Sequence, residues 1–242
     1  MKKRFFRKKL IKLVRWLAKK LNKFDLFPPF EYVQMLSEES VHSFLNVEKS
    51  AIKHWVIVGG CYGYEIPKIL ENYPNCIVSV FECSKRYARD LQEKFLNNKR
   101  VNIITKAVSD EVGQQIFFET NRTGSGSLLK VGELAKRDYD MEQAEDFSVE
   151  TTTLDKFFID EKIDVLQIDV QGAELMVLEG AVETLPNIRA VFVEVSVHPN
   201  LYQNSVVFDD LHNFFNKFGF HLCLFGTGYN LTGNALYVRQ NL

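Results

Sequence analysis

Residues 163–174 read Ile-Asp-Val-Leu-Gln-Ile-Asp-Val-Gln-Gly-Ala-Glu, and this stretch decides the fold. The apolar run Val165–Ile168 is typical of a buried strand, Gln171-Gly172 supplies a bend, and an amphipathic helix follows from about Ala173. A strand, a short turn and a helix in this order indicate a parallel sheet. Ligands of such sheets bind beyond the carboxyl ends of the strands, so Asp169 falls where chemistry is done. A carboxylate there is costly to bury unless another group satisfies it.

Strands and helices alternate outward from this stretch over most of the chain. Strands are expected at Trp55–Val58, Cys76–Phe81, Val101–Lys106, Ile163–Ile168, Ala190–Val195, Phe220–Phe225 and Ala235–Arg239. Helices are expected at Tyr64–Glu71, Lys85–Leu96, Ala173–Leu185 and Phe208–Phe218, and another opens near Thr153. This order predicts the α/β class: a Rossmann-like, seven-stranded, mostly parallel sheet with helices on both faces. The last two strands have no helix between them and are expected to form an antiparallel hairpin at one edge.

The pattern is weaker in the middle of the chain. An extra strand is expected at Gln115–Glu119 and a short one at Val149–Thr152, and residues 121–127 read as a loop of Gly, Ser and Thr. Residues 128–147 are charged and give no clear period, so no element is assigned to them.

The charge of the chain is divided unevenly along its length. Residues 1–23 hold eleven of the 30 Lys and Arg and none of the 31 Asp and Glu, which leaves residues 24–242 with 19 bases against 31 acids, a net charge of −12. Apolar side chains from Phe6 to Phe24 recur at helical spacing, and Pro28-Pro29 ends the pattern. We expect a basic amphipathic helix at residues 1–27, a helical lead-in at 28–50 with a helix over Glu31–Leu45, and one α/β domain at 51–242.

The basic helix has three candidate partners. Residues 1–24 could lie on an anionic membrane surface, dock on the acidic body or another subunit, or contact nucleic acid. The apolar stripe, with Phe5, Phe6 and Trp16, favours the membrane surface and makes nucleic acid the weakest candidate. The segment lacks the uninterrupted apolar centre of a signal peptide or membrane span. The four cysteines form no CxxC pair, which is typical of free thiols in a reducing compartment. We therefore expect a cytoplasmic protein, peripheral at the inner face of the membrane; its oligomeric state is not predicted.

Two strand ends carry features suited to a nucleoside. The turn after the first strand reads Val58-Gly-Gly-Cys-Tyr-Gly63, where glycines let a ligand approach the backbone and the next helix offers a partly positive N-terminus. Cys61 and Tyr64 stand where the GxGxxG fingerprint needs glycine, so the turn suits a ligand without phosphates. Glu82 ends the second strand and could accept hydrogen bonds from both ribose hydroxyls. A plain tight turn and a solvated acid are the alternatives.

The remaining candidates also follow strands. Ala107-Val-Ser-Asp110 could border a purine ring, or form an ordinary turn capped by Ser109 or Asp110. Glu174 stands in the first turn of a helix, where the helix dipole alone favours an acid. Glu194 ends a strand and could orient a substrate or pair with a base. His198 follows it and could transfer a proton, although a surface histidine is the alternative.

Several enzyme classes lose support from missing patterns. The chain has no GxxxxGK[ST], no HExxH and no nucleophile elbow followed by the order of a catalytic triad. No His or Cys pair has the spacing of metal ligands, so no metal is predicted.

Taken together, these residues resemble FkbM-type methyltransferases over roughly residues 50–240. The resemblance rests on segments that follow each other in the family's order: Gly59–Gly63, Phe81-Glu82, Ala107–Asp110, Ser127-Leu128, Thr153–Asp155, Ile168–Glu174, Leu178–Ala181 and Glu194-Val195. It implies an S-adenosylmethionine-dependent O-methyltransferase domain at residues 51–242. The acceptor implied is a hydroxyl of a glycan, a glycolipid or a similar sugar-containing molecule.

The resemblance also implies roles for individual residues. It puts Gly59, Gly60 and Gly63 beside the methionine part of S-adenosylmethionine, and Glu82 on its ribose. Ser109 or Asp110 would lie near the adenine, and Asp169 near the sulfonium and the incoming hydroxyl. The proton of that hydroxyl could pass to Asp169, Glu194 or His198, and we expect Asp169 to be the base because it is closest to the switch point of the sheet.

One departure from the family supports a second hypothesis. The family usually has Asp where this chain has Ile57, and the resemblance implies that this acid pairs with the amino group of the cofactor. The alternative function is therefore a catalytically weak or inactive member of the same fold that acts as a membrane-associated binding module. A nicotinamide-dependent oxidoreductase is disfavoured by the missing GxGxxG. Residues 121–147 are expected to shape the acceptor site.

Overall fold

The computed structural model describes residues 41–227 and 232–239, and these belong to one compact unit, Leu36–Leu242. The predicted amphipathic helix at residues 1–27 lies outside the described residues, as does the first part of the lead-in. Of the helix expected over Glu31–Leu45, the described part forms helix α2, Val41–Phe44, which is followed by a 3-10 turn, η3, at Lys49–Ala51.

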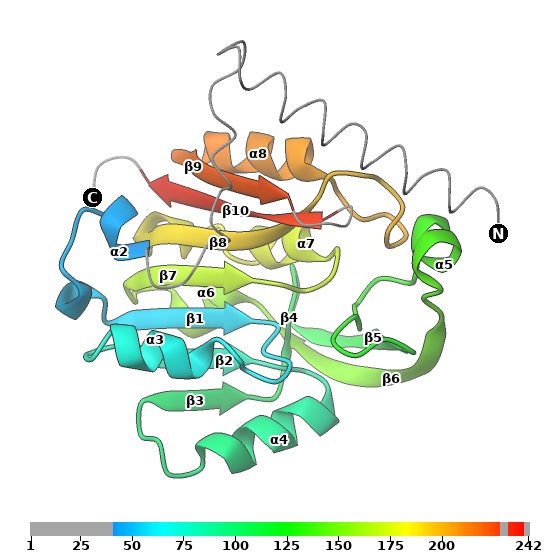
Figure 1. Ribbon diagram of the computed structural model, residues 1–242, viewed down its shortest axis with the longest axis horizontal. Coiled ribbons are helices and arrows are strands. Elements are labelled where there is room, and N and C mark those ends of the chain that lie inside the picture. The colour runs from blue at the N-terminus through cyan, green and yellow to red at the C-terminus, as the bar shows by residue number, and fades with distance from the viewer. Residues whose placement is uncertain (1–40, 228–231, 240–242) are drawn as a thin grey trace, which may run out of the picture. The chain divides into compact units, whose positions relative to one another are not determined.

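The main sheet has seven strands in the order β3-β2-β1-β7-β8-β10-β9 (Figure 1). The bounds are β1 His54–Val58, β2 Ile77–Phe81, β3 Val101–Ile104, β7 Ile163–Ile168, β8 Ile188–Ser196, β9 Phe220–Thr227 and β10 Thr232–Arg239. Strands β3, β2, β1, β7 and β8 run parallel to one another, whereas β10 pairs antiparallel with both β8 and β9. The predicted Rossmann-like sheet and its antiparallel edge hairpin are confirmed.

Helices cover both faces of this sheet because its central strands are apolar on both sides. In β1, Val56 and Val58 face one core cluster, and Trp55 and Ile57 face the other. The first cluster includes residues of α6 (Leu154–Phe158), α7 (Glu174–Glu179) and α8 (Phe208–Lys217), and the second includes residues of α2, α3 (Ile66–Asn72) and α4 (Lys85–Phe95). Each such side chain contributes about 1.5–3 kcal/mol on full burial.

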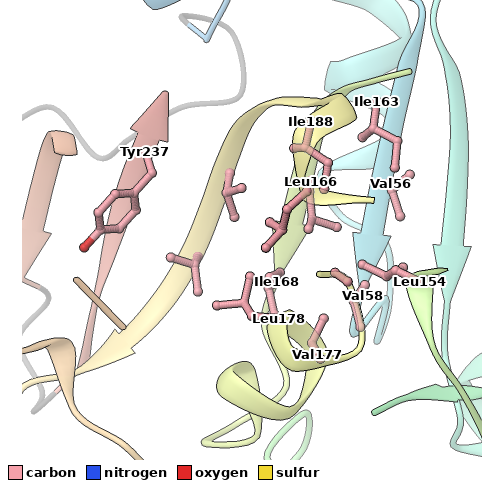
Figure 2. Close-up of a cluster of buried hydrophobic side chains, with 14 of the residues drawn as sticks. Val56, Val58, Leu154, Ile163, Leu166, Ile168, Val177, Leu178, Ile188 and Tyr237 are labelled. Carbon is pink, nitrogen blue, oxygen red and sulfur yellow. The ribbon is translucent and has the colours of Figure 1, made fainter. Parts of the chain in front are cut away.

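Figure 2 shows how the first cluster joins distant parts of the chain. Val56 of β1, Leu166 of β7 and Ile188 of β8 pack beside one another. Val177 and Leu178 of α7 lie farther along, next to Ile168. Each of these five side chains is fully buried. This packing fixes the strand ends that carry the candidate site.

A second, smaller sheet was only partly predicted. It has the order β4-β6-β5, with β4 Ala107–Val108, β5 Gly113–Thr120 and β6 Gln143–Thr152, and helix α5 (Glu133–Tyr139) precedes β6. Strand β6 begins earlier than the expected Val149–Thr152. The sequence did not reveal its first half, because that half is solvent-exposed and carries no apolar alternation. In Figure 1, β5 and β6 lie beyond the arrowheads of β1 and β7.

Two predicted elements end earlier than expected. Strand β3 stops at Ile104, not Lys106, because the chain turns there into β4. Helix α7 ends at Glu179 and not at the expected Leu185. The next residue, Gly180, packs against the backbone of Ser109, whose carbonyl oxygen would lie 2.0 Å from a side chain at this position. The chain then continues through turns to a short 3-10 helix, η4, at Leu185–Asn187.

Candidate active site

A cleft opens where the carboxyl ends of β1, β2 and β7 meet the small sheet. The space between its walls, open mouth included, is about 650 Å³. Its wall contains three of the residues singled out from the sequence, Gly59, Glu82 and Asp169. The structure therefore brings the first glycine and the two principal acids together.

Gly59 holds the floor of the cleft. It has a φ of +92°, and a Cβ there would meet the carbonyl oxygen of Asp169 at 1.8 Å. The amides of Gly59 and Asp169 donate to the carbonyls of Phe81 and Val58, at 3.0 and 2.9 Å. Only glycine accommodates this backbone contact, which joins the end of β1 to the end of β7.

Gly60 and Gly63 have a different surrounding. A Cβ on Gly60 would meet Val80 at 2.4 Å, and one on Gly63 would meet Ile66 at 2.6 Å. Neither glycine is in the wall of the cleft, so both allow the turn to pack tightly on β2 and α3. Their contact with the cofactor stays a prediction.

Glu82 is buried at the end of β2 and holds two backbone amides. Its Oε2 accepts from the amide of Cys61 and its Oε1 from the amide of Ser84, both at 2.7 Å. Burial raises the pKa of Glu82 to about 6, although these two bonds oppose the rise. Cys61, which the sequence did not single out for this role, has a φ of 42° and lines the cleft.

Of the segment expected beside the purine, Ala107–Asp110, the first two residues line the cleft in place of the last two. Ala107 and Val108 line the cleft, but Ser109 and Asp110 do not. Ser109 is fully buried, accepts from Gln115 at 3.0 Å and donates to Asp110 at 2.8 Å. A role for Ser109 or Asp110 beside adenine stays a prediction, and the apolar pair before them occupies the wall.

Glu119 of β5 is a site residue that the sequence analysis missed. It lines the cleft with Phe117 and Leu128, and among the described residues nothing hydrogen-bonds its buried Oε2. Burial raises the pKa of Glu119. The available signal was the alternation of β5, which puts residues 117 and 119 on one face.

Asp169 and Glu194 form a coupled pair at the ends of β7 and β8. The side-chain amide of Gln171 donates to Asp169 Oδ1 and to Glu194 Oε2, at 2.7 Å each. Burial and then the charge of Asp169 raise the pKa of Glu194 well above its usual range. Glu194 is therefore the weaker acid of the two.

Asp169 is the member of the pair that ionises first. Surrounding protein raises its pKa as well, although its side chain faces the open cleft and solvent reaches it. The bonds from Gln171 and Glu194 stabilise its charged form. An ionised carboxylate at a cleft, hydrogen-bonded to a neutral acid, can accept a proton from a bound hydroxyl.

Glu174 and His198, the other two acid–base candidates, occupy two different places in the structure. Glu174 is buried, and its Oε1 accepts from the amides of Val170 and Gly172, at 3.3 and 3.0 Å, so it fixes the turn after β7. Burial raises the pKa of Glu174 to about 7. His198 is exposed, and its Nδ1 lies 2.9 Å from the carbonyl of Pro199. The structure does not bring His198 into the wall of the cleft, so its part in proton transfer stays a prediction.

Tyr202 completes the network and was also missed. It is buried, and its hydroxyl lies 3.0 Å from Gln171 Oε1 and 2.9 Å from the carbonyl of Ser125. The tyrosine thus fixes the side chain that touches both carboxyl groups. No local pattern could reveal it, since Ser125 and Tyr202 are far apart in the sequence.

The side chains that line the cleft suit a positively charged nucleoside. Glu82, Glu119 and Asp169 face it, and Lys106, the one basic residue in its wall among those the structure describes, pairs with Glu150. Acids suit the sulfonium, amino group and ribose hydroxyls of S-adenosylmethionine and disfavour phosphates. The apolar wall of Ala107, Val108, Phe117 and Leu128 suits its purine. Fold and site together define the class of Rossmann-like methyltransferases.

The chain belongs to the methyltransferase FkbM domain family, whose model matches residues 58–222. This confirms the predicted family, the methyltransferase class and S-adenosylmethionine as the cofactor.

A curated relative is the 2-O-methyltransferase NoeI of Sinorhizobium fredii (strain NBRC 101917 / NGR234), 30% identical over 148 residues. The match covers 57% of this chain and 61% of NoeI, so the chain spans less than two thirds of that relative's length. Among solved structures, the chain is similar to magnesium protoporphyrin IX methyltransferase from Synechocystis PCC 6803 with bound SAM, at 11% identity and a TM-score of 0.47, over 84% of this chain and 79% of that one. The fibrillarin/Nop5p complex is similar at 13% identity and a TM-score of 0.48, over 87% and 84%.

None of the helices within 41–227 and 232–239 has the length and apolar character needed to cross a bilayer. The same residues contain no group of three or more His, Cys, Asp and Glu side chains that could hold a metal.

Proposed function

We propose that this protein transfers the methyl group of S-adenosylmethionine to a hydroxyl of a glycan, a glycolipid or a similar sugar-containing acceptor. The observation that carries the proposal is the Asp169–Glu194 pair, which places an ionisable base at the end of an acid-lined cleft. The name of the relative NoeI describes methyl transfer to an oxygen, which supports O-methylation here.

When bound, S-adenosylmethionine supplies a methyl group on a positively charged sulfur. Glu82 would hold the ribose, and Glu119 and Asp169 would face the cationic groups. Transfer to the acceptor oxygen would form a C–O bond, break the C–S bond and leave its electron pair on sulfur. Asp169 would accept the hydroxyl proton as this bond forms. Gln171, whose amide donates to both carboxyl groups, would hold Asp169 and Glu194 in place.

Two measurements test this function. S-adenosylhomocysteine should raise the melting temperature of the full chain, and NAD should not, because only a ligand of the folded state stabilises it. Labelled methyl transfer to a panel of p-nitrophenyl glycosides should then identify an acceptor. Asp169→Asn should keep the affinity for S-adenosylhomocysteine and lose about 10²- to 10⁴-fold in turnover. The control is Asp160→Asn, a change at an exposed position away from the cleft. Full turnover of Asp169→Asn would refute its role as the base.

The second candidate is a catalytically weak or inactive member that acts as a membrane-associated binding module. Ile57 favours it, since this side chain is 1% exposed and packs in the apolar core in place of the family's usual acid. The absence of a thermal shift with either ligand would support this candidate over the enzyme.

We also propose that residues 1–24 bring the protein to an anionic membrane surface, which would place it at the inner face of the membrane in the cytoplasm. The support is the run of eleven basic residues interleaved with apolar ones. The full chain should bind phosphatidylglycerol vesicles and should not bind phosphatidylcholine vesicles. A chain without residues 1–24 should lose this binding, and unchanged binding would reject the proposal.

A further inference from the structure

Glu119 of strand β5 brings to the cleft a hydrogen-bond acceptor that the protein itself leaves unused. Its Oε2 is buried, and among the residues that the structure describes no group donates a hydrogen bond to it. An acceptor buried without a donor destabilises a fold. The Glu119 side chain lines the cleft, so a bound molecule with an O–H group would supply the missing donor.

The neighbours of Glu119 show which end of the cleft it occupies. Burial raises the pKa of Glu82 and of Cys83, and the negative charge of Glu119 raises both further. These two residues directly follow β2, where the acid expected on the ribose lies. Glu119 therefore stands beside the position of the ribose.

Glu119 also lies next to the wall that suits the purine. Phe117, a member of that apolar wall, precedes it by two residues on β5, and alternation puts both side chains on one face of the strand. A Cβ on Gly126 would lie 2.6 Å from the Phe117 ring and 3.5 Å from Glu119 Oε2, so one point of the neighbouring loop packs against both. Glu119 is thus placed where the purine wall meets the ribose acid.

Glu82 has limited capacity for two ribose hydroxyls. Each of its oxygens already accepts a backbone amide, from Cys61 and from Ser84, at 2.7 Å. A carboxylate oxygen has two lone pairs, so each oxygen can accept one more hydrogen bond at most, and Glu82 is only 6% exposed. A second acid beside it would take one of the two hydroxyls.

We propose that the unpaired Oε2 of Glu119 accepts a hydrogen bond from the 2′-hydroxyl of the ribose of S-adenosylmethionine, while Glu82 holds the 3′-hydroxyl. The 2′-hydroxyl stands on the carbon next to the one that carries the purine, so it faces the junction where Glu119 lies. The charge of Glu119 attracts the cationic cofactor as a whole, and this bond adds a directional contact. The inference rests on the cofactor of the proposed function and makes Glu119 the residue that selects nucleosides with a free 2′-hydroxyl.

Binding of S-adenosylhomocysteine and of its 2′-deoxy and 3′-deoxy analogues at pH 8 tests the inference. Glu119→Met keeps the length of the side chain and removes both oxygens. Its Kd for S-adenosylhomocysteine should rise about tenfold or more, as expected when a hydrogen bond to a charged group is lost. With the 2′-deoxy analogue there is no such bond to lose, so wild type and variant should agree within about twofold. With the 3′-deoxy analogue the difference between them should persist.

Glu145→Met is the matched control. Glu145 pairs with Glu119 in the register of β5 and β6, is exposed and does not line the cleft. Its replacement removes an equal charge from the same pair of strands and should leave every Kd unchanged.

The stability of the free chain separates a ligand contact from a structural role. Glu119→Met should melt no lower than wild type without ligand, because an apolar side chain beside Phe117 replaces an acid whose buried oxygen has no donor. Glu119→Gln, which keeps one accepting oxygen and no charge, should have a Kd between those of wild type and Glu119→Met. It decides the question if the methionine variant does not fold.

The outcomes separate the inference from the proposed function. If the wild-type chain binds no S-adenosylhomocysteine, the proposed function fails and the inference fails with it. If the wild-type chain binds it and Glu119→Met keeps the same Kd, or loses as much affinity for the 2′-deoxy analogue, the inference alone is wrong. A lower melting temperature of the free Glu119→Met chain, or an equal loss of affinity in Glu145→Met, would give Glu119 a structural or a general electrostatic role and overturn the inference as well.

Discussion

Replacing Glu82 by glutamine tests the central carboxylate of the cleft. Each of its two oxygens accepts one backbone amide, from Cys61 and from Ser84, at 2.7 Å. A glutamine has one accepting oxygen, so its NH2 group must face one of these amides. The change keeps the size of the side chain but leaves one buried N–H without an acceptor, at a cost of about 1–3 kcal/mol.

Glutamine also cannot ionise, so the variant avoids the loss of stability that the wild-type chain suffers when Glu82 becomes charged at higher pH. The pKa of Glu82 is raised from 4.5 to about 6, so its contribution to stability is fully present below pH 4.5 and is lost as the pH rises through 6. The whole loss is about 2 kcal/mol, and about 1 kcal/mol of it falls between pH 5 and pH 8. Glu82→Gln should therefore destabilise the chain clearly at pH 5 and by about 1 kcal/mol less at pH 8.

Cofactor affinity should fall at pH 8, where Glu82 is ionised. Hydrogen bonds from ribose hydroxyls to a charged acceptor contribute about 1.5–3 kcal/mol, which corresponds to an increase of about 10- to 150-fold in Kd. Urea unfolding at pH 5 and pH 8 measures the first effect, and titration calorimetry with S-adenosylhomocysteine measures the second. Glu93→Gln, on the exposed side of α4, should change neither. A Glu82→Gln chain with wild-type affinity would refute the ribose assignment, and parallel stability losses at both pH values would refute the raised pKa.

Three further changes address the frame of the site. Gly59→Ala should destabilise the chain by about 2–5 kcal/mol in urea unfolding, from positive-φ strain and the clash with Asp169, whereas Gly113→Ala, with its nearest neighbour at 3.9 Å, should be neutral; equal effects would contradict the reasoning. Glu174→Gln keeps one oxygen that accepts both amides, and it removes a carboxyl group whose pKa is raised from 4.5 to about 7. The free energy of unfolding should therefore rise by up to about 3 kcal/mol above pH 7 and stay unchanged below pH 4.5. Melting temperatures of wild type and variant that agree at every pH would count against this. Asp164→Ala leaves Arg189 and the amides of Lys53 and His54 without their acceptor and should cost about 3–5 kcal/mol by thermal unfolding; a loss below 1 kcal/mol would show that water replaces the carboxylate.

The main sheet could be predicted because its pattern is local. Strands buried on both faces read as short apolar runs, and β1, β2 and β7 appear in the sequence almost at their observed bounds. The small sheet could not be predicted in full, because β6 has a polar first half whose partner strand, β5, supplies the hydrogen bonds. Backbone pairing of exposed strands leaves little trace in residue type.

The site residues divide in the same way, into those that the local sequence indicates and those that depend on contacts across the fold. Glu82 and Asp169 were found because each directly follows a buried strand, where topology alone places it at the ligand edge. Gln171 and Tyr202 were missed as functional residues because their roles come from contacts across the fold, such as the bond between their side chains. Contacts of this kind depend on how loops dock, which no local period encodes.

The electrostatics of the cleft bear on whether the fold acts as an enzyme or as an inert module. Ile57 has taken an acid's usual place by joining the apolar core, yet Glu82, Glu119 and Asp169 all still face the cleft with raised pKa values. Carboxyl groups held against their preferred ionisation destabilise a fold, and apolar side chains of similar volume would relieve that cost. Violations of this kind are expected where a ligand offsets them. A bound cation with ribose hydroxyls would offset all three, which favours a working cofactor site over a binding module that leaves its cleft unused.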